Sequence, residues 1–181
     1  MAGKRGVRVT LLVEDRMIER FARRVLVRLG FHDRELRIEP YPSGRGSAKQ
    51  WVDKQYARLV RVHRSKSYQK GLAIVVGTDA DELTLNQRSL QLAACLEAEK
   101  LDPRQAKESI VHWIPKWNIE TWILALLGES IDEDQNYKDR VQSPPLDQVA
   151  TTFVEQFRNQ VTECVLPSLL ATYVETKRLP S

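Results

Sequence analysis

The sequence predicts an α/β fold in which a central, mainly parallel sheet is flanked by helices. Short apolar runs rich in Val, Ile and Leu alternate with longer segments in which apolar residues recur every three or four positions. Runs of the first kind are typical of strands buried on both faces of a parallel sheet. Segments of the second kind are typical of amphipathic helices. Their alternation along the chain indicates βαβ units.

The predicted elements follow one another as βαβ units require. In order they are a strand at residues 9–13, a helix at 18–29, a weaker strand at 35–41, a helix at 47–59, a loop at 63–70, a strand at 72–76, a helix at 84–100, a strand at 109–114, a short helix at 118–127 and a tail helix at 149–164. Gly30 and Gly128 are suitable stops for the helices before them. Ser47 is a suitable N-cap, and Pro167 is expected to end or kink the tail helix.

Composition predicts an ordinary globular protein. The chain has 181 residues, of which 42% are hydrophobic and 29% are charged, enough for one domain with its own core. No stretch reaches the roughly 18 apolar residues of a membrane span, and the amino terminus lacks the apolar segment of a signal peptide. Two cysteines are too few for a disulfide framework. We therefore expect a cytoplasmic protein with no membrane partner.

The domain organisation follows from an interruption after the short helix. An acidic segment at 132–139 and the pair Pro144-Pro145 separate that helix from the tail. We therefore expect an α/β unit at residues 1–128 and a helical C-terminal extension at 129–181 that packs on the same domain. Two small domains are the alternative.

Two short acidic clusters each stand at the end of an apolar run. Glu14 and Asp15 follow the first strand, and Asp79 and Asp81 closely follow the strand at 72–76. The carboxyl ends of parallel strands line the crevice where open α/β sheets bind ligands, so these acids are expected to meet there. On an extended strand end, Asp79 and Asp81 would point to the same side.

Carboxylates that converge repel one another unless a cation lies among them. Hard divalent cations prefer oxygen ligands of this kind. The pattern therefore predicts a Mg²⁺ or Mn²⁺ site with Glu14, Asp79 and Asp81 as ligands, used in chemistry on phosphate. Asp15 is a candidate further ligand. The simpler interpretation is that Asp-x-Asp forms only a turn with a helix cap.

A basic loop before the second helix is a candidate phosphate-binding segment. It contains Arg45, Gly46, Ser47 and Lys49. Backbone N–H groups at a helix N-terminus attract anions, and the two basic side chains add positive charge. A plain turn with solvated basic residues is the alternative.

The segment after the last predicted strand is dense in functional groups. Lys116 could reach the same crevice and neutralise a phosphate oxygen, which makes it a candidate catalytic residue. Glu120 stands among apolar residues, where a charged group needs a partner, and is therefore a candidate metal ligand. The alternative is that Glu120 only caps a helix. Trp117 and Trp122 are expected to be core or interface anchors.

Three of these features together resemble the Toprim domain. They are Glu14 after the first strand, the loop around Gly46 after the second strand, and Asp79 with Asp81 after the next core strand. Toprim domains occur in topoisomerases, bacterial primases, small recombination proteins and nucleases of the overcoming-lysogenisation-defect type. The resemblance covers roughly residues 7–115. It implies a Toprim/Rossmann-like sheet, with Glu14 as a metal ligand or general base.

Two departures from the Toprim pattern bear on the number of metal ions. Nucleases of this group usually carry a further acid one turn into the first helix, where this chain has Ile18 with Glu19 beside it. Ala80 stands between the two aspartates where some relatives have a third acid. One ion, or a second held by Asp15, Glu19 or Glu82, is therefore expected.

The function expected from these features is metal-dependent nuclease activity on DNA or RNA. A net charge of +4, with most of the basic excess before residue 70, is compatible with nucleic acid. By analogy, the chain is expected to be the nuclease subunit of a phage-defence or DNA-repair assembly. Its protein partner would be an ATPase subunit or a second copy of itself.

Two other functions remain open. The segment from Leu11 to Phe31, with its acidic pair Glu14-Asp15, also resembles the opening of a response-regulator receiver. In that case Asp79 would accept a phosphoryl group and Lys116 would be the switch lysine. Two features argue against a receiver. The gap from Glu14 to Asp79 is longer than in receivers, and the Met-Pro pair that usually follows the phosphoacceptor is absent after Asp79. The third possibility is a non-catalytic nucleic-acid-binding subunit.

Overall fold

One four-stranded parallel sheet forms the centre of the molecule. The computed structural model describes residues 6–40, 47–69, 71–163 and 165–180. Its strands are β1 (Arg8–Val13), β2 (Leu36–Ile38), β3 (Leu72–Gly77) and β4 (Ile110–Trp113). They pair in the order β2-β1-β3-β4, and each pair is parallel. The predicted α/β class with a parallel sheet is confirmed.

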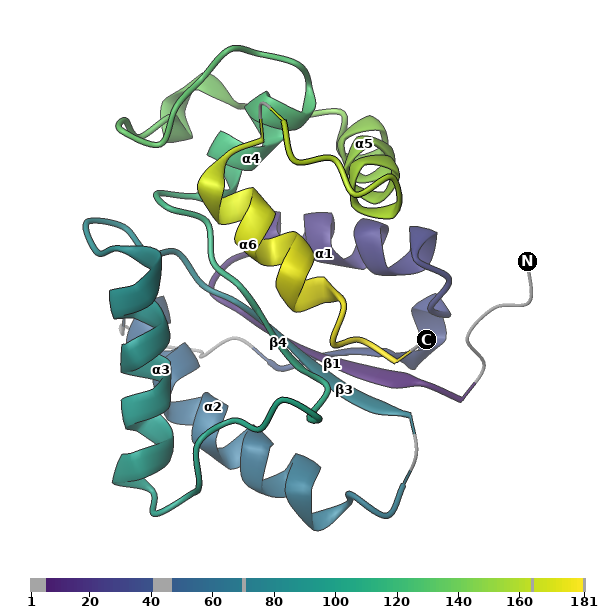
Figure 1. Ribbon diagram of the computed structural model, residues 1–181, viewed down its shortest axis with the longest axis vertical. Helices are drawn as coiled ribbons and strands as arrows, with labels where there is room; N and C mark the ends of the chain where they lie inside the picture. Colours follow the sequence, from purple (N-terminus) through teal and green to yellow (C-terminus); the bar gives the residue numbers. More distant parts are fainter. Residues whose placement is uncertain (1–5, 41–46, 70, 164, 181) are drawn as a thin grey trace.

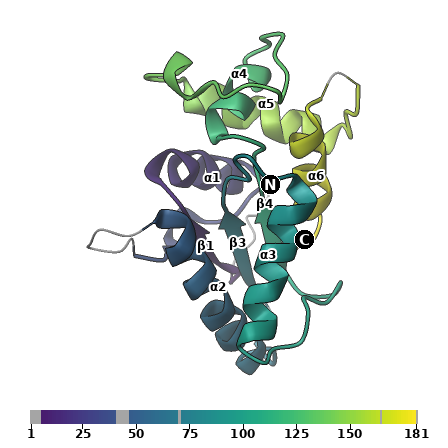
Figure 2. The same ribbon diagram turned by 90° about the vertical axis from the view of Figure 1, so that its left-hand side faces the viewer.

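Helices cover both faces of this sheet. The described residues form six α-helices: α1 (Arg16–Arg28), α2 (Ala48–Ser65), α3 (Leu85–Ala98), α4 (Ile119–Leu126), α5 (Leu146–Arg158) and α6 (Pro167–Thr176). Two short 3₁₀ turns, η1 (Asp33–Glu35) and η2 (Lys138–Arg140), lie between them. Helices α1, α4, α5 and α6 lie on one side of the sheet, and α2 and α3 lie on the other (Figure 1). Figure 2 shows the strands between these two layers.

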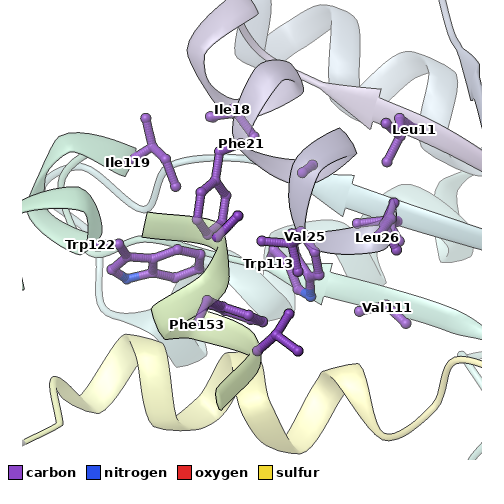
Figure 3. Close-up of a cluster of buried hydrophobic side chains, with 14 of the residues drawn as sticks. Leu11, Ile18, Phe21, Val25, Leu26, Val111, Trp113, Ile119, Trp122 and Phe153 are labelled. Carbon is purple, nitrogen blue, oxygen red and sulfur yellow. The ribbon is translucent and has the colours of Figure 1, made fainter. Parts of the chain in front are cut away.

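The alternation of side chains along each strand builds two separate cores. In β1, Leu11 faces the core that includes α1 and α5, whereas Leu12 faces the core that includes α2 and α3. The first core contains an aromatic cluster. There, Phe21 of α1 lies edge-on to Phe153 of α5, with ring centroids 5.6 Å apart, and Trp122 of α4 lies beside it (Figure 3). Both faces of the sheet are therefore buried, as the apolar strand sequences predict.

Local signals in the sequence fix several element ends as predicted. The Ser47 hydroxyl accepts a hydrogen bond from the backbone N–H of Gln50 and caps α2. Thr84 and Gln87 form a reciprocal capping box at the start of α3. Gly30 follows α1 with φ +100°, a conformation that glycine adopts without a steric penalty.

Three element boundaries differ from the prediction. Strand β2 has only three residues, rather than seven. Helix α2 continues to Ser65 through residues predicted as loop, because Arg64 in its last turn binds Glu108 (Nε–Oε1 2.6 Å) and anchors it. The tail forms two helices rather than one. Pro167 begins α6 instead of ending a helix, since proline lacks the N–H that a first helical residue leaves unpaired anyway.

The C-terminal helices share the core of the sheet. Phe153 of α5 and Leu169 of α6 are buried in the same cluster as Leu11 of β1 and Trp113 of β4. At the surface, the Arg28 guanidinium of α1 donates to the Asp147 carboxylate of α5 at 2.8 Å. No helix in the described ranges is long and apolar enough to cross a bilayer.

Candidate active site at the strand ends

The acidic residues gather where β1 and β3 end side by side. The N–H of Glu14 donates to the carbonyl oxygen of Gly77 at 3.1 Å, which ties the two strand ends together. Connections from β1 to β2 and from β3 to β4 run to opposite sides, so the chain reverses its strand order between β1 and β3. Open α/β sheets bind ligands at such a point.

Gly77 lets the first helix approach this point closely. A Cβ atom on Gly77 would lie 2.5 Å from Cγ2 of Ile18 and 3.0 Å from Cγ1 of Val13. The first separation is shorter than real Cβ contacts and the second is tighter than most of them, so only glycine fits without a shift. The start of α1, and with it Asp15, is thereby held against the end of β3.

Glu14 is held on both carboxylate oxygens. The Thr78 hydroxyl donates to Oε1 at 2.5 Å, and the backbone N–H of Asp79 donates to Oε2 at 3.3 Å. Burial raises the pKa of Glu14, although these hydrogen bonds and the positive charges of Arg88 and Lys49 act in the opposite direction. Glu14 therefore lies in the predicted place, against Asp79.

Asp79 is the electrostatic centre of the site. Its Oδ1 atom is buried and has no hydrogen-bond partner among the described residues. Burial raises its pKa well above the ordinary aspartate value, and the negative charges of Glu14, Asp15, Asp81 and Glu120 raise it further. The four other acids predicted as ligands therefore all act on this one carboxyl group.

Asp81 does not stand on an extended strand end, contrary to expectation. Strand β3 ends at Gly77, and the backbone of Asp81 has φ +54°, so the alternation of strand side chains does not apply to it. Its half-exposed carboxylate binds the Lys49 ammonium, with Nζ 3.0 Å from Oδ2. Lys116 donates to its backbone oxygen at 2.5 Å, and the same ammonium lies 4.1 Å from the ring centre of Trp117.

Asp15 and Glu120 flank the cluster from the starts of two helices. Asp15 caps α1, with Oδ1 accepting from the N–H groups of Met17 at 2.7 Å and Ile18 at 2.9 Å. Glu120 lies in the first turn of α4 and is only 7% exposed. Burial raises its pKa, and the charge of Asp15 raises it further while Lys138 lowers it. Asn118, rather than Glu120, caps α4.

The predicted phosphate-binding loop is only partly described. Arg45 and Gly46 lie outside the described residues. Ser47 has its hydroxyl engaged as the cap of α2. Lys49, the second residue of α2, is brought to the acidic site through its ion pair with Asp81. Trp122 is fully buried, as expected for a core anchor, and donates to the Ser168 hydroxyl at 2.6 Å.

The donor set suits a hard cation, but the side chains are turned to other partners. Within the described ranges, no three His, Cys, Asp or Glu side chains are placed as a closed metal site. Glu14 is bonded to Thr78, and Asp81 is paired with Lys49. The unpartnered Oδ1 of Asp79 fits a cation, since a buried carboxylate oxygen without a donor is costly. An ion would have to draw Asp81 away from Lys49.

Sequence reasoning missed a buried group behind the site. Arg88 of α3 is fully buried and contacts Thr78, Asp53 and Glu14. Its position could have been noticed, because it falls on the apolar stripe of the predicted helix 84–100, three residues after Leu85 and four before Leu92. A charged residue on such a stripe needs a buried partner.

The arrangement thus combines oxygen ligands with two ammonium groups at one edge of the sheet. Carboxylates there can hold a cation, and Lys49 and Lys116 can hold an anion beside it. Comparisons with protein-family models, with curated proteins and with solved structures found no match for this chain.

Proposed function

We propose that this protein is a divalent-metal-dependent nuclease in which Glu14, Asp79 and Asp81 bind Mg²⁺ or Mn²⁺. The observation that carries this proposal is the buried Oδ1 of Asp79, which has no hydrogen-bond partner among the described residues. Four other acids raise the pKa of this carboxyl group. A carboxylate in such surroundings must take up either a proton or a cation. A hard divalent cation satisfies the oxygen and offsets the clustered negative charge.

The residues around the cation have separate roles in the proposed reaction. A bound ion would stabilise the charge that develops on the phosphate and lower the pKa of a water molecule. Glu14 is positioned as a ligand or general base, because each of its oxygens accepts one hydrogen bond and keeps a lone pair. Asp15 and Glu120 border the cluster as outer carboxylates.

Lys49 links cation binding to phosphate binding in this proposal. Its ammonium now neutralises Asp81 at 3.0 Å. If Asp81 held a divalent ion, Lys49 would be free to pair with a phosphate oxygen. Lys116, on the other side of Asp81, holds the loop backbone and adds a second positive charge. Both lysines thus favour an anionic substrate once the cation is in place.

The Toprim resemblance supports the same activity. Its acids follow the first strand and the third strand of a parallel sheet, and Glu14, Asp79 and Asp81 follow β1 and β3. We therefore propose a Toprim/Rossmann-like domain, acting as the nuclease subunit of a phage-defence or DNA-repair assembly with an ATPase partner or a second copy. The substrate is a nucleic acid.

The proposal is tested by measuring metal binding and cleavage on the same variants. Isothermal titration with Mn²⁺ would compare the wild type with Asp79→Asn, and cleavage would be assayed on plasmid, single-stranded DNA and RNA. We expect Asp79→Asn to lose Mn²⁺ binding and at least about 100-fold of the cleavage rate. Asp102→Asn is the matched control, because this exposed aspartate lies in the loop before β4, at the other end of the sheet.

Other results would point to other functions. Equal Mn²⁺ affinity in the wild type and Asp79→Asn would contradict the site. Binding without cleavage of any substrate would indicate a non-catalytic subunit. An acid-labile adduct on Asp79 after treatment with acetyl phosphate would indicate a receiver domain instead.

A further inference from the structure

Arg88 is a buried cation directly behind the candidate active site. Its side chain has no exposed surface, and it is the one Lys or Arg that is buried in the described ranges. A guanidinium keeps its charge at any pH that a folded protein survives. Its burial is therefore tolerated only where its donors and its charge are matched.

The partners of Arg88 come from α2, from α3 and from the residues that follow β1 and β3. Nε and Nη2 both donate to the hydroxyl oxygen of Thr78, at 3.1 and 2.7 Å, and Nη1 donates to Gln91 at 3.0 Å. Nη2 also lies 2.9 Å from Oδ1 of Asp53 in α2 and 3.9 Å from Oε1 of Glu14. Arg88 thus joins α2 and α3 to the residue that follows β3.

Two donors on one hydroxyl determine where its proton points. A threonine oxygen has two lone pairs and one O–H group. Arg88 fills both lone pairs, so the O–H of Thr78 must be directed at a different acceptor. That acceptor is Oε1 of Glu14, at 2.5 Å. A hydroxyl that would otherwise rotate is thereby oriented toward the carboxylate.

We propose that Arg88, acting through Thr78, is a positioning residue that fixes the carboxylate of Glu14 in the orientation in which it binds the divalent cation. The inference rests on the proposed function for the role of the cation, but not for the orientation of Glu14. Arg88 touches neither cation nor substrate in this arrangement. Hydrogen-bond partners behind a metal ligand orient it and tune its affinity.

A purely structural role is the competing explanation. Arg88 would then only join α2, α3 and β3, and the contact of Thr78 with Glu14 would be incidental. The two explanations differ in what happens when single contacts are removed. Loss of the Thr78 hydroxyl should affect Glu14, whereas loss of Gln91, which binds Arg88 from the exposed side of α3, should not.

The test compares three variants with the wild type by Mn²⁺ titration and by crystal structures of the metal-free proteins. Thr78→Val keeps the shape and removes the hydroxyl, Thr78→Ser keeps the hydroxyl, and Gln91→Leu is the control. We expect Thr78→Val to lower Mn²⁺ affinity about 10–100-fold and to displace the Glu14 carboxylate. Thr78→Ser and Gln91→Leu should stay within about threefold of wild type. If Thr78→Val does not fold, Arg88→Lys tests the same contact, because it keeps the charge and loses the paired donors.

The two measurements separate this inference from the proposed function. Wild-type affinity in Thr78→Val, or an unmoved Glu14 carboxylate in its crystal structure, would overturn the positioning role. If the wild type binds no Mn²⁺, the proposed function fails, and the crystal structures alone decide whether Thr78 orients Glu14. A loss in Gln91→Leu equal to that in Thr78→Val would favour the structural explanation.

Discussion

At the residue scale, Asp79 combines burial with like charges that oppose its ionisation. Its Oδ1 atom is out of contact with solvent, and the carboxylates of Glu14, Asp15, Asp81 and Glu120 act on it. Arg88 and Lys49 offset part of this negative charge at Glu14. The folded protein therefore favours the neutral form of Asp79 when no cation is bound.

A pH-dependent gain in stability is expected for Asp79→Asn. A carboxyl group whose folded pKa is raised stabilises the fold below its unfolded pKa, and this contribution is lost as pH rises through the folded pKa. Without metal, the variant should match the wild type near pH 4 and become more stable as pH rises to 8. Each tenfold change in the protonation equilibrium is worth about 1.4 kcal/mol, or about 3–6 °C in Tm for a chain of this size.

Thermal unfolding in EDTA between pH 4 and 8 measures this difference. Asp102→Asn serves again as the control and should show no comparable trend, since Asp102 is exposed. A Tm difference for Asp79→Asn that does not grow with pH would contradict the electrostatic account of the site.

At the scale of elements, Glu175 attaches α6 to the edge of the sheet. Its carboxylate accepts from the backbone N–H of His112 in β4 at 3.0 Å, and it pairs with Arg104, which donates from Nη2 to Oε1 at 3.0 Å. Arg104 also donates to the carbonyl oxygen of Ile110 at 2.9 Å. Strand β4 is an edge strand, so these groups take the place of a further strand.

Removal of this carboxylate is expected to destabilise the protein. Glu175→Ala leaves the strand N–H and the partly buried Arg104 without their acceptor, which should cost about 2–3 kcal/mol. Glu155→Ala, at an exposed position of α5, makes the same substitution in a helix and should change stability by about 0.5 kcal/mol or less. Urea unfolding of both variants measures this difference. Equal losses in the free energy of unfolding would contradict the proposed role of Glu175 in attaching α6 to β4.

At the scale of the whole molecule, the C-terminal helices complete the main core. Phe153 of α5 lies against Phe21, Trp113 and Tyr173, with ring centroids 5.6, 5.7 and 4.9 Å apart. These four rings come from α1, β4, α5 and α6 (Figure 3 shows the first three). A core shared in this way couples residues 129–181 to the sheet.

Phe153→Ala should therefore weaken the entire protein. We expect a loss of about 3–5 kcal/mol with a single cooperative transition, because the ring is fully buried. Phe157→Ala, one turn later and only partly buried, should lose less. Circular dichroism and tryptophan fluorescence should report the same midpoint. Two transitions, with only one of them shifted, would show that residues 129–181 form a separate domain.

The order of strands and helices was predictable because its causes are local. Apolar runs mark β1 and β3, Ser47 and Thr84 cap their helices, and Gly30 ends α1. Pro167 was misjudged, since its effect depends on whether a helix begins or continues there. Glu14 and Asp79 were also predictable, because strands of a parallel sheet all deliver their ends to one edge.

The sequence by itself determined the parallel sheet and which acids would stand at its carboxyl edge. Only the tertiary structure decided that Asp81 would turn to Lys49, that Oδ1 of Asp79 would be left without a hydrogen bond in the described part of the chain, and that Arg88 would lie behind Glu14. The physical reason is the separation along the chain over which each interaction acts. Periodicity and capping act over a few residues. Ion pairs and buried hydrogen bonds join distant positions, such as Glu14 and Arg88, which are 74 residues apart, and therefore depend on how whole layers pack.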